Sequence, residues 1–427
     1  MKCKMLLLAL LSIASMPVYA GNPHSEILAD KMLSTANHRL YPAPDSDAVL
    51  PAAPQGYVPF HISTYARHGS RYLISQRDYE RALAPMLKAA NDGVLTSTGE
   101  IVKERLEKIR CMAEEGRYGE LTPAGAAQHR GIANRMYRNF PEIFEGEVKV
   151  RARSTDVMRC AMSMMAECLE LQRLNPQLII DHDASRADLN VLNDYVCADS
   201  LRKAWRPERL AAVKSQKEKL DASRLMPVLF SDAQWVKENI DNTKECLWNL
   251  FFVASNMQSH SDPDLDLMWV FTPEECYRCW LVNNVEWYMM VGNTPLTDYR
   301  MPRQQVNLLR DFIADSDKFV QTRERGATLR FGHESVLIPT VVPMGINNYD
   351  YSTDNLETLH EHWADYEIFP MAANLQFVFY RNPEDPAADV LVRVMLNEED
   401  VRLPVDSFLF PFYKWSEVRA HLYRSAN

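Results

Sequence analysis

Two short polar segments of the chain combine histidines with arginines and a carboxylic acid. Arg67-His68-Gly69-Ser70-Arg71 places a histidine between two arginines, and Gly332-His333-Glu334 places a histidine before an acid. A guanidinium group is a planar fork that matches phosphate oxygens. The first segment could therefore hold a phosphoryl group against a histidine nucleophile, while an acid such as Glu334 protonates the leaving oxygen. An Arg-His-Gly alone is a weak signal, so its position in the fold decides its value.

Each of these segments follows a predicted strand. Residues 57–66 are rich in aromatic and β-branched side chains, and residues 327–332 form a second short strand. Ligands of open α/β sheets bind beyond the carboxyl ends of the strands. If the two strands are parallel members of one sheet, His68 and His333 lie at the same edge.

The surrounding pattern alternates between helices and strands. A strand at 147–153 precedes a helix that carries Arg159, and Thr122 with Pro123 begins a helix that ends near Asn139. This alternation implies a largely parallel sheet covered by helices. The other predicted elements are helices at 76–91 and 98–114, a short buried strand at 178–180, and strands at 375–381 and 390–396.

The predicted fold class is α/β, with a Rossmann-like, mostly parallel sheet core flanked by helices. We assign this core to residues 21–183 and 326–427. Strand signals are scarce over 185–325, where helical stretches such as 207–220 and 304–316 predominate. We therefore predict an inserted, mostly α-helical cap domain at 185–325, and parts of 76–115 could join it.

Five segments in the same order resemble the histidine acid phosphatases. Residues 65–72 (Tyr-Ala-Arg-His-Gly-Ser-Arg-Tyr) are similar to the signature of this family, which belongs to branch 2 of the histidine phosphatase superfamily. Within the family, Tyr72 is typical of the multiple inositol polyphosphate phosphatases, which include phytases. The other matching segments are 121–128, 154–160, 332–334 and 372–397.

The resemblance implies a two-step reaction without a metal or other cofactor. His68 would attack the phosphoryl group and form a phosphohistidine. Glu334 would protonate the leaving oxygen and then assist the hydrolytic water. The residues that would hold the phosphoryl oxygens are Arg67, Arg71, Arg159 and His333.

Two features depart from the inositol polyphosphate branch. That branch places its glutamate two residues after the histidine, whereas Glu334 follows His333 directly and Ser335 stands at the usual position. The proline and threonine that usually follow the signature are replaced by Leu73-Ile74-Ser75.

Composition and charge exclude several other classes of protein. The chain is 47% hydrophobic and 24% charged, which is ordinary for a globular protein. Its 47 basic and 57 acidic residues give a net charge of −10, which argues against nucleic-acid binding. Residues 1–20 are typical of a signal peptide with a small-x-Ala cleavage site, and no later stretch is apolar enough for a membrane span. We expect an exported monomer, periplasmic or secreted.

Export also permits disulfides, and seven cysteines follow the predicted signal peptide. Cys276-Tyr-Arg-Cys279 is interpreted as a structural pair or two buried thiols rather than a metal site. Residues 181–183 and 360–362 contain histidine and acid, yet solvated turns or helix surfaces explain them better than metal ligands. The segment 262–266 lacks the glycine and glutamate of a calcium loop.

Three functions are consistent with these observations. The first is an exported phosphomonoesterase whose partner is a phosphorylated small molecule, namely an inositol polyphosphate such as phytate. The second is a broad acid phosphatase acting on sugar phosphates or nucleotides. The third, which the displaced glutamate suggests, is a non-catalytic homologue that binds phosphate ligands.

Overall fold

A computed structural model describes residues 21–45, 50–114, 116–407 and 409–427. They contain an eight-stranded sheet in the order β3-β2-β4-β1-β5-β6-β7, with β8 also paired to β6. The predicted signal peptide at 1–20 lies outside the described residues. The strands are β1 (Val58–Arg67), β2 (Lys149–Ser154), β3 (Ile179–Asp183), β4 (Gly326–Gly332), β5 (Asn374–Arg381), β6 (Leu391–Leu396), β7 (Glu399–Asp400) and β8 (Phe412–Lys414).

The sheet is parallel on one side and antiparallel on the other. β3, β2, β4 and β1 run parallel to one another. β5 pairs antiparallel with β1, and the strands beyond it continue antiparallel. This arrangement confirms the predicted α/β class with a mostly parallel core. It also places the carboxyl ends of β1 and β4 side by side.

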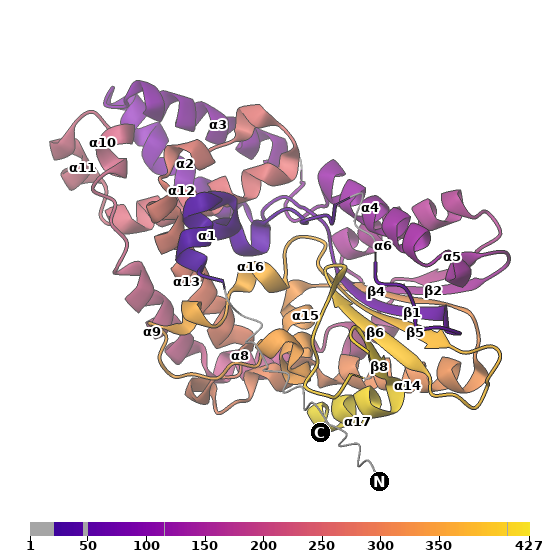
Figure 1. The fold of residues 1–427 in the computed structure, drawn as a ribbon. Helices are drawn as coiled ribbons and strands as arrows, with labels where there is room; N and C mark the ends of the chain where they lie inside the picture. The colour runs from indigo at the N-terminus through magenta and orange to yellow at the C-terminus, as the bar shows by residue number, and fades with distance from the viewer. Residues whose placement is uncertain (1–20, 46–49, 115, 408) are drawn as a thin grey trace, which may run out of the picture.

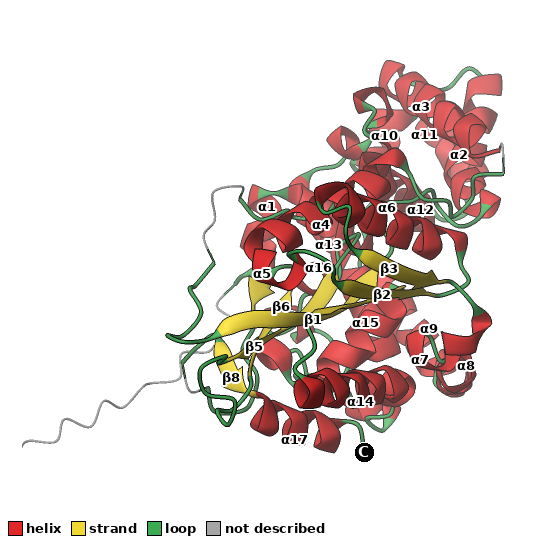
Figure 2. Cartoon of the chain, turned by 90° about the vertical axis from the view of Figure 1, so that its right-hand side faces the viewer, coloured by secondary structure: helices red, strands yellow, loops and turns green. Residues whose placement is uncertain are grey.

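Helices cover both faces of the sheet (Figure 2). Along β5, Leu375, Phe377 and Phe379 pack into one core, whereas Val378 and Tyr380 pack into the other. This alternation follows from the two-residue period of a strand. The first core lies against α14 (Val306–Thr322), α15 (Glu334–Val341) and α17 (Trp415–Ser425), and the second against α4 (Pro123–Asn139), α5 (Pro141–Phe144) and α6 (Met158–Leu174).

A third hydrophobic core belongs to a helical lobe beside the sheet (Figure 1). It draws residues from both the early and the central part of the chain, including helices within 76–114. We propose that this lobe is the cap domain and that α14, which packs under the sheet, belongs to the main core. The helices in the lobe are α1 (Pro23–Ala29), α2 (Gln76–Asn91), α3 (Ser97–Glu114), α10 (Leu225–Leu229), α11 (Ala233–Asn239), α12 (Thr243–Asn256) and α13 (Pro273–Val291).

Shorter helices link the lobe to the sheet. They are α7 (Leu189–Leu192), α8 (Tyr195–Ala204), α9 (Arg206–Lys217) and α16 (Asp365–Ile368). Through α8, the chain passes from the edge of the sheet toward the lobe (Figure 1). Among the described helices, none is long and apolar enough to cross a membrane.

Two expectations from the sequence need correction. The strand predicted as buried at 178–180 forms part of β3, an edge strand on which Ile179 is about half exposed at 49%. The seven described cysteines are all free thiols, so the permitted disulfides are not present among them. Cys276 and Cys279 are both buried on α13, which leaves two buried thiols as the correct alternative.

Candidate active site

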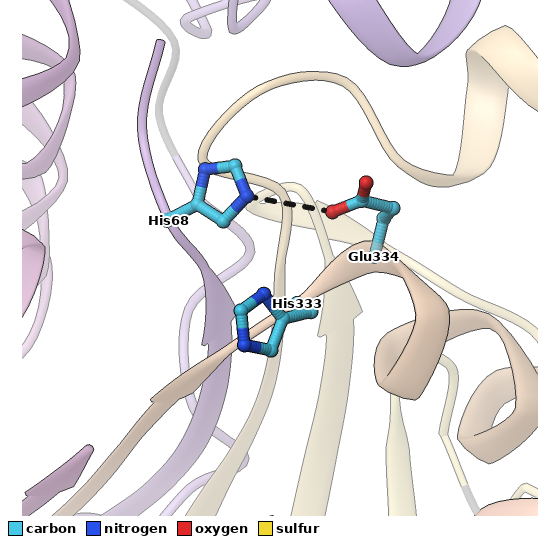
Figure 3. Close-up of side chains that lie close together, drawn as sticks. All are labelled: His68, His333 and Glu334. Atoms are coloured by element: carbon cyan, nitrogen blue, oxygen red, sulfur yellow. Dashed lines mark ion pairs between the residues drawn. The ribbon is translucent and has the colours of Figure 1, made fainter. Parts of the chain in front are cut away.

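The carboxyl ends of β1 and β4 bring the two polar segments together. Arg67 pairs in register with Gly332, and the backbone amide of His68 donates to the Gly332 carbonyl at 2.9 Å. The rings of His68 and His333 therefore lie close, with centroids 5.7 Å apart (Figure 3). The predicted meeting of both histidines at one sheet edge is thus observed.

His68 is held as a neutral ring with one nitrogen free to react. Its side chain is fully buried, and Nδ1 lies 2.9 Å from the carbonyl oxygen of Gly69. A carbonyl only accepts, so Nδ1 carries the proton and Nε2 retains its lone pair. Burial lowers the pKa of His68 well below its ordinary value, and the charges of Arg159 and Arg67 act in the same direction, against Glu334.

Glu334 faces both His68 and Arg67. Its Oε2 lies 3.0 Å from Nε of Arg67. The same oxygen lies 3.5 Å from Nε2 of His68 (Figure 3). Burial opposes its ionisation, but the charges of Arg67 and Arg71 act against burial, and the pKa of Glu334 lies well below its usual range. Glu334 therefore reaches the histidine although it directly follows His333, and the arginines beside it favour its carboxylate form.

Three arginines supply more positive charge than this single carboxylate balances. The side chain of Arg67 is fully buried, and its Nη1 donates to the Phe369 carbonyl at 2.7 Å. Burial, with Arg67 and Arg159, lowers the pKa of Arg71 to about 10 despite Glu334. The described residues provide no hydrogen-bond acceptor for Nη2 of Arg67, Nε of Arg71 or Nε of Arg159. Buried donors of this kind normally have partners, so they are available to an anionic ligand.

His333 lies beside His68 and is also neutral. Burial lowers its pKa to about 4, and Arg159 adds to the shift. The hydroxyl of Tyr65 accepts from the backbone amide of His333 at 3.0 Å and donates to the Leu192 carbonyl at 3.1 Å. The thiol of Cys160 lies 3.7 Å from Nε2 of His333. We define His68, His333, Glu334 and the three arginines as the histidine–arginine cluster.

Close backbone packing supports the loop that carries His68. A Cβ atom added at Gly69 would lie only 2.4 Å from the carbonyl oxygen of Gly125, near the start of α4. The converse also holds, because a Cβ at Gly125 would lie 2.3 Å from the Ser70 carbonyl oxygen. Glycine at these two positions thus lets the loop and α4 touch. Thr122 caps α4 as predicted, with its side chain accepting from the Gly125 amide.

Sequence reasoning did not assign two residues that lie near the cluster, His38 and Arg202. His38, near the N-terminus, is buried, and the charges of Arg71, Arg67 and Glu334 all act on its ring. Arg202 donates to the Ser335 carbonyl at 3.5 Å, at the first turn of α15. In the sequence, a solvated helical face explains the basic run at 202–206 that contains Arg202, so the run did not indicate where Arg202 lies in the fold. Nothing in the local sequence around His38 indicates its position.

The donor set of this cluster favours an anion over a metal ion. His68, His333 and Glu334 could each offer one ligand atom, and these atoms lie within 4.8 Å of one another. Two imidazoles and a carboxylate are suitable ligands for a transition metal. However, the charges of Arg67, Arg71 and Arg159 act on these same groups and would repel a cation.

Comparison with known proteins identifies the family. Residues 62–397 match the model of the histidine phosphatase superfamily (branch 2), a span that contains every member of the cluster. The chain belongs to this family. Its enzyme class is therefore that of the histidine acid phosphatases. No curated protein matches the chain.

Several solved structures share the fold of this branch 2 member at low sequence identity. The multiple inositol polyphosphate phosphatase of Bifidobacterium longum is 19% identical with a TM-score of 0.74, over 92% of this chain and 98% of that one. The phytase from D. castellii is 14% identical with a TM-score of 0.66, over 97% and 89% of the two chains. The phytase of Hafnia alvei is 11% identical with a TM-score of 0.51, over 88% and 98%.

Proposed function

We propose that this histidine acid phosphatase hydrolyses phosphate monoesters of highly phosphorylated small molecules, inositol hexakisphosphate first, through a phosphohistidine on His68. The observation that carries the proposal is the buried histidine–arginine cluster, in which guanidinium donors that find no acceptor among the described residues surround a neutral histidine whose Nε2 retains its lone pair. Such a site stabilises the charge on a phosphoryl group in the transition state of its transfer.

The proposed reaction has two steps. First, the Nε2 lone pair of His68 forms an N–P bond while the P–O bond to the alcohol breaks, and Glu334 gives its proton to the leaving oxygen. Second, water attacks phosphorus, the Glu334 carboxylate takes a proton from that water, and the N–P bond breaks. Arg67, Arg71 and Arg159, with His333, hold the three remaining oxygens. No metal or cofactor is needed to balance either step.

Glu334 needs a proton before the first step, although its pKa is well below the usual range in the ligand-free protein. A phosphate dianion that binds Arg67 competes with the ion pair at 3.0 Å and adds negative charge beside the carboxylate. Both effects raise the pKa of an acid. We therefore propose that substrate binding itself causes Glu334 to become protonated.

The preference for several phosphates is supported by cations beyond the cluster. Arg202 and Arg209 are close enough for their charges to interact, and Glu334 also acts on Arg202. Within the described residues, Nε of each is buried without a hydrogen-bond partner. Two of the proteins that share the fold are named for inositol polyphosphates or as phytases. Export to the periplasm or the medium completes the proposal and is motivated by residues 1–20.

The decisive experiment measures turnover and the covalent intermediate together. Phosphate release from phytate, a sugar phosphate and p-nitrophenyl phosphate is compared, and ³²P-labelled enzyme is trapped by denaturation during turnover. Wild type should prefer phytate and yield labelled protein, and His68→Ala should yield neither product nor label. Preference for the simple esters would favour the broad acid phosphatase, and binding without turnover would favour the non-catalytic homologue. Full activity in His68→Ala would contradict the mechanism.

The role of Glu334 has its own test. Glu334→Gln should slow phytate hydrolysis by about 10²-fold or more but affect p-nitrophenyl phosphate far less, because p-nitrophenolate leaves without a proton. Phosphate binding, followed with a pH indicator in weakly buffered solution, should take up a proton in wild type and none in Glu334→Gln. Equal slowing of both esters would remove Glu334 from the acid role.

A further inference from the structure

A buried chain of three residues links two helices to the peptide between Arg67 and His68. His129 on α4 is fully buried. Its Nδ1 lies 2.9 Å from Oε2 of Glu167 on α6, and its Nε2 lies 3.1 Å from the backbone carbonyl oxygen of Arg67. Glu167 is itself only 1% exposed. The ring of His129 also packs on Phe331 of β4, with centroids 5.7 Å apart.

The hydrogen bonds of His129 fix its orientation and the proton on Nε2. A carbonyl oxygen only accepts, so Nε2 carries a proton toward Arg67. A second proton lies between Nδ1 and the Glu167 carboxyl group, because two acceptors cannot bond without one. A histidine whose second nitrogen is bonded to a carboxylate is held in one tautomer and one ring position.

The backbone amide and Nη1 of Arg67 are also fixed. Its backbone amide donates to the Ala373 carbonyl at 2.7 Å, and its Nη1 donates to the Phe369 carbonyl at 2.7 Å. The backbone amide of the next residue, His68, is bonded to Gly332. His129 is the described partner of the Arg67 carbonyl, and a buried carbonyl without a partner would favour rotation of that peptide.

We propose that His129, oriented by Glu167, is a positioning residue for the phosphoryl-transfer reaction. It holds the peptide that joins Arg67 to His68 and thereby aligns Nε2 of His68 with the bound phosphoryl group. This inference rests on the proposed function of His68. His129 touches neither the substrate nor the reacting atoms, and its effect passes through the backbone of the two residues that do.

Three variants separate a positioning role from mere stability. His129→Phe preserves an aromatic ring but donates no hydrogen bond, His129→Gln retains a donor for the Arg67 carbonyl, and Glu167→Gln keeps a polar partner for Nδ1. We expect kcat to fall about 10²-fold in His129→Phe, with a much smaller change in KM, because a small misplacement of a reacting group has that effect. His129→Gln should recover at least part of this loss.

A matched control lies at the opposite end of the same strand. His61 on β1 is buried, and its ring stacks on Phe319 with a centroid distance of 3.7 Å. His61→Phe and His61→Gln should lower the melting temperature but leave kcat per folded molecule unchanged. Equal kcat in wild type, His129→Phe and His129→Gln would overturn the proposal, as would identical losses in the two His129 variants.

Nuclear magnetic resonance of the histidine rings gives a readout that does not depend on turnover. In ¹⁵N-histidine-labelled protein, the His68 signals should shift in His129→Phe and Glu167→Gln and stay unchanged in His61→Phe. If His129→Phe does not fold, Glu167→Gln carries the test, and unchanged His68 signals with unchanged kcat in that variant would overturn the proposal. Activity that survives in His68→Ala would refute the proposed function instead, so the two failures are distinguishable.

Discussion

Two groups of buried arginines on the same sheet differ in how their charge is balanced. In the histidine–arginine cluster, three arginines share the single carboxylate of Glu334, and several guanidinium nitrogens have no acceptor in the described part of the chain. We define the second group, Arg153 and Arg330 with Asp188, Asp311 and Asp315, as the Arg330 cluster. In that group three carboxylates form ion pairs with two arginines.

The Arg330 cluster satisfies its central arginine completely. The side chain of Arg330 is fully buried, and its Nε, Nη1 and Nη2 donate to Asp311, Ser63 and Asp315 at 2.7, 2.9 and 3.0 Å. This cluster lies between the sheet and α14, which carries Asp311 and Asp315. Nε of Arg153 also lacks a hydrogen-bond partner among the described residues, so one unpaired guanidinium nitrogen does not indicate a ligand. The contrast teaches that the balance of charge is the better guide, because three carboxylates neutralise two arginines here and one carboxylate faces three arginines in the histidine–arginine cluster.

The largest expected effect comes from removing an arginine that lacks a carboxylate of its own. Arg71→Met should lower kcat/KM by about 10³-fold, because an arginine that stabilises the transferring phosphoryl group contributes that much. It should not lower the free energy of unfolding, since Arg67 and Arg159 already disfavour the charge of Arg71. Steady-state kinetics and urea denaturation check both parts. A variant that is less stable but fully active would reverse the assignment of the two clusters.

The same substitution in the other cluster should do the opposite. Arg330→Met leaves Asp315 without its ion pair and should cost about 3–5 kcal/mol in the free energy of unfolding. The kcat of the molecules that remain folded should equal that of wild type, because Arg330 faces α14 and not His68 or His333. Urea denaturation measures the stability loss, and active-site titration corrects kcat for the folded fraction. A selective loss of kcat without loss of stability would contradict the comparison.

Much of the histidine–arginine cluster was predictable from the sequence. His68 and His333 both follow strands, and parallel pairing of β1 with β4 places them together as expected. The helix that carries Arg159 was also predicted, because the strand β2 and the start of α6 have clear local signals. These predictions succeeded because each site residue is adjacent to the end of a regular element.

The rest of the site depends on packing between distant segments. Glu167 and His129 look like ordinary residues in the interiors of two helices, and their contact depends on how α4 crosses α6. The Arg330 cluster was missed for the same reason, because Arg330 joins carboxylates on α14 that no local pattern connects to β4. The buried strand predicted at 178–180 failed since an apolar run does not reveal whether its strand ends up at the edge of a sheet.

A smaller effect concerns the dependence of stability on pH, to which one buried histidine near each cluster contributes. Burial lowers the pKa of His61, which neighbours Asp315 and Arg330, to about 4, and it lowers the pKa of His333 to about 4 as well. Between pH 6.5 and 4 the unfolded chain therefore binds protons that the folded chain excludes. Each histidine contributes stability that is full above pH 6.5 and is lost as the pH falls toward 4.

Removing either histidine should therefore flatten the acid side of the stability curve, by up to about 3 kcal/mol at pH 4 relative to wild type. Burial raises the pKa of Asp365 to about 7, so this residue adds stability as the pH falls, which is opposite to the effect of the histidines. Asp365 is present in wild type, His61→Gln and His333→Gln, so its contribution cancels when each variant is compared with wild type. Only His333→Gln should also lose activity at neutral pH. Thermal denaturation from pH 4 to 8 measures the curves, and an unchanged acid slope in both variants would refute this account.

The smallest expected effect is the stabilisation of the protein by inorganic phosphate. A ligand that binds only the folded state at 100 times its Kd adds about 2.7 kcal/mol to the free energy of unfolding. Wild type and Arg330→Met should both gain this increment, although Arg330→Met starts from a lower stability. Arg71→Met should gain almost none, because it lacks a guanidinium group that has to hold the anion. Chloride at equal ionic strength controls for screening of surface charge. Equal increments in all three proteins would place the bound phosphate outside the histidine–arginine cluster, and the excess of positive charge there would then need another explanation.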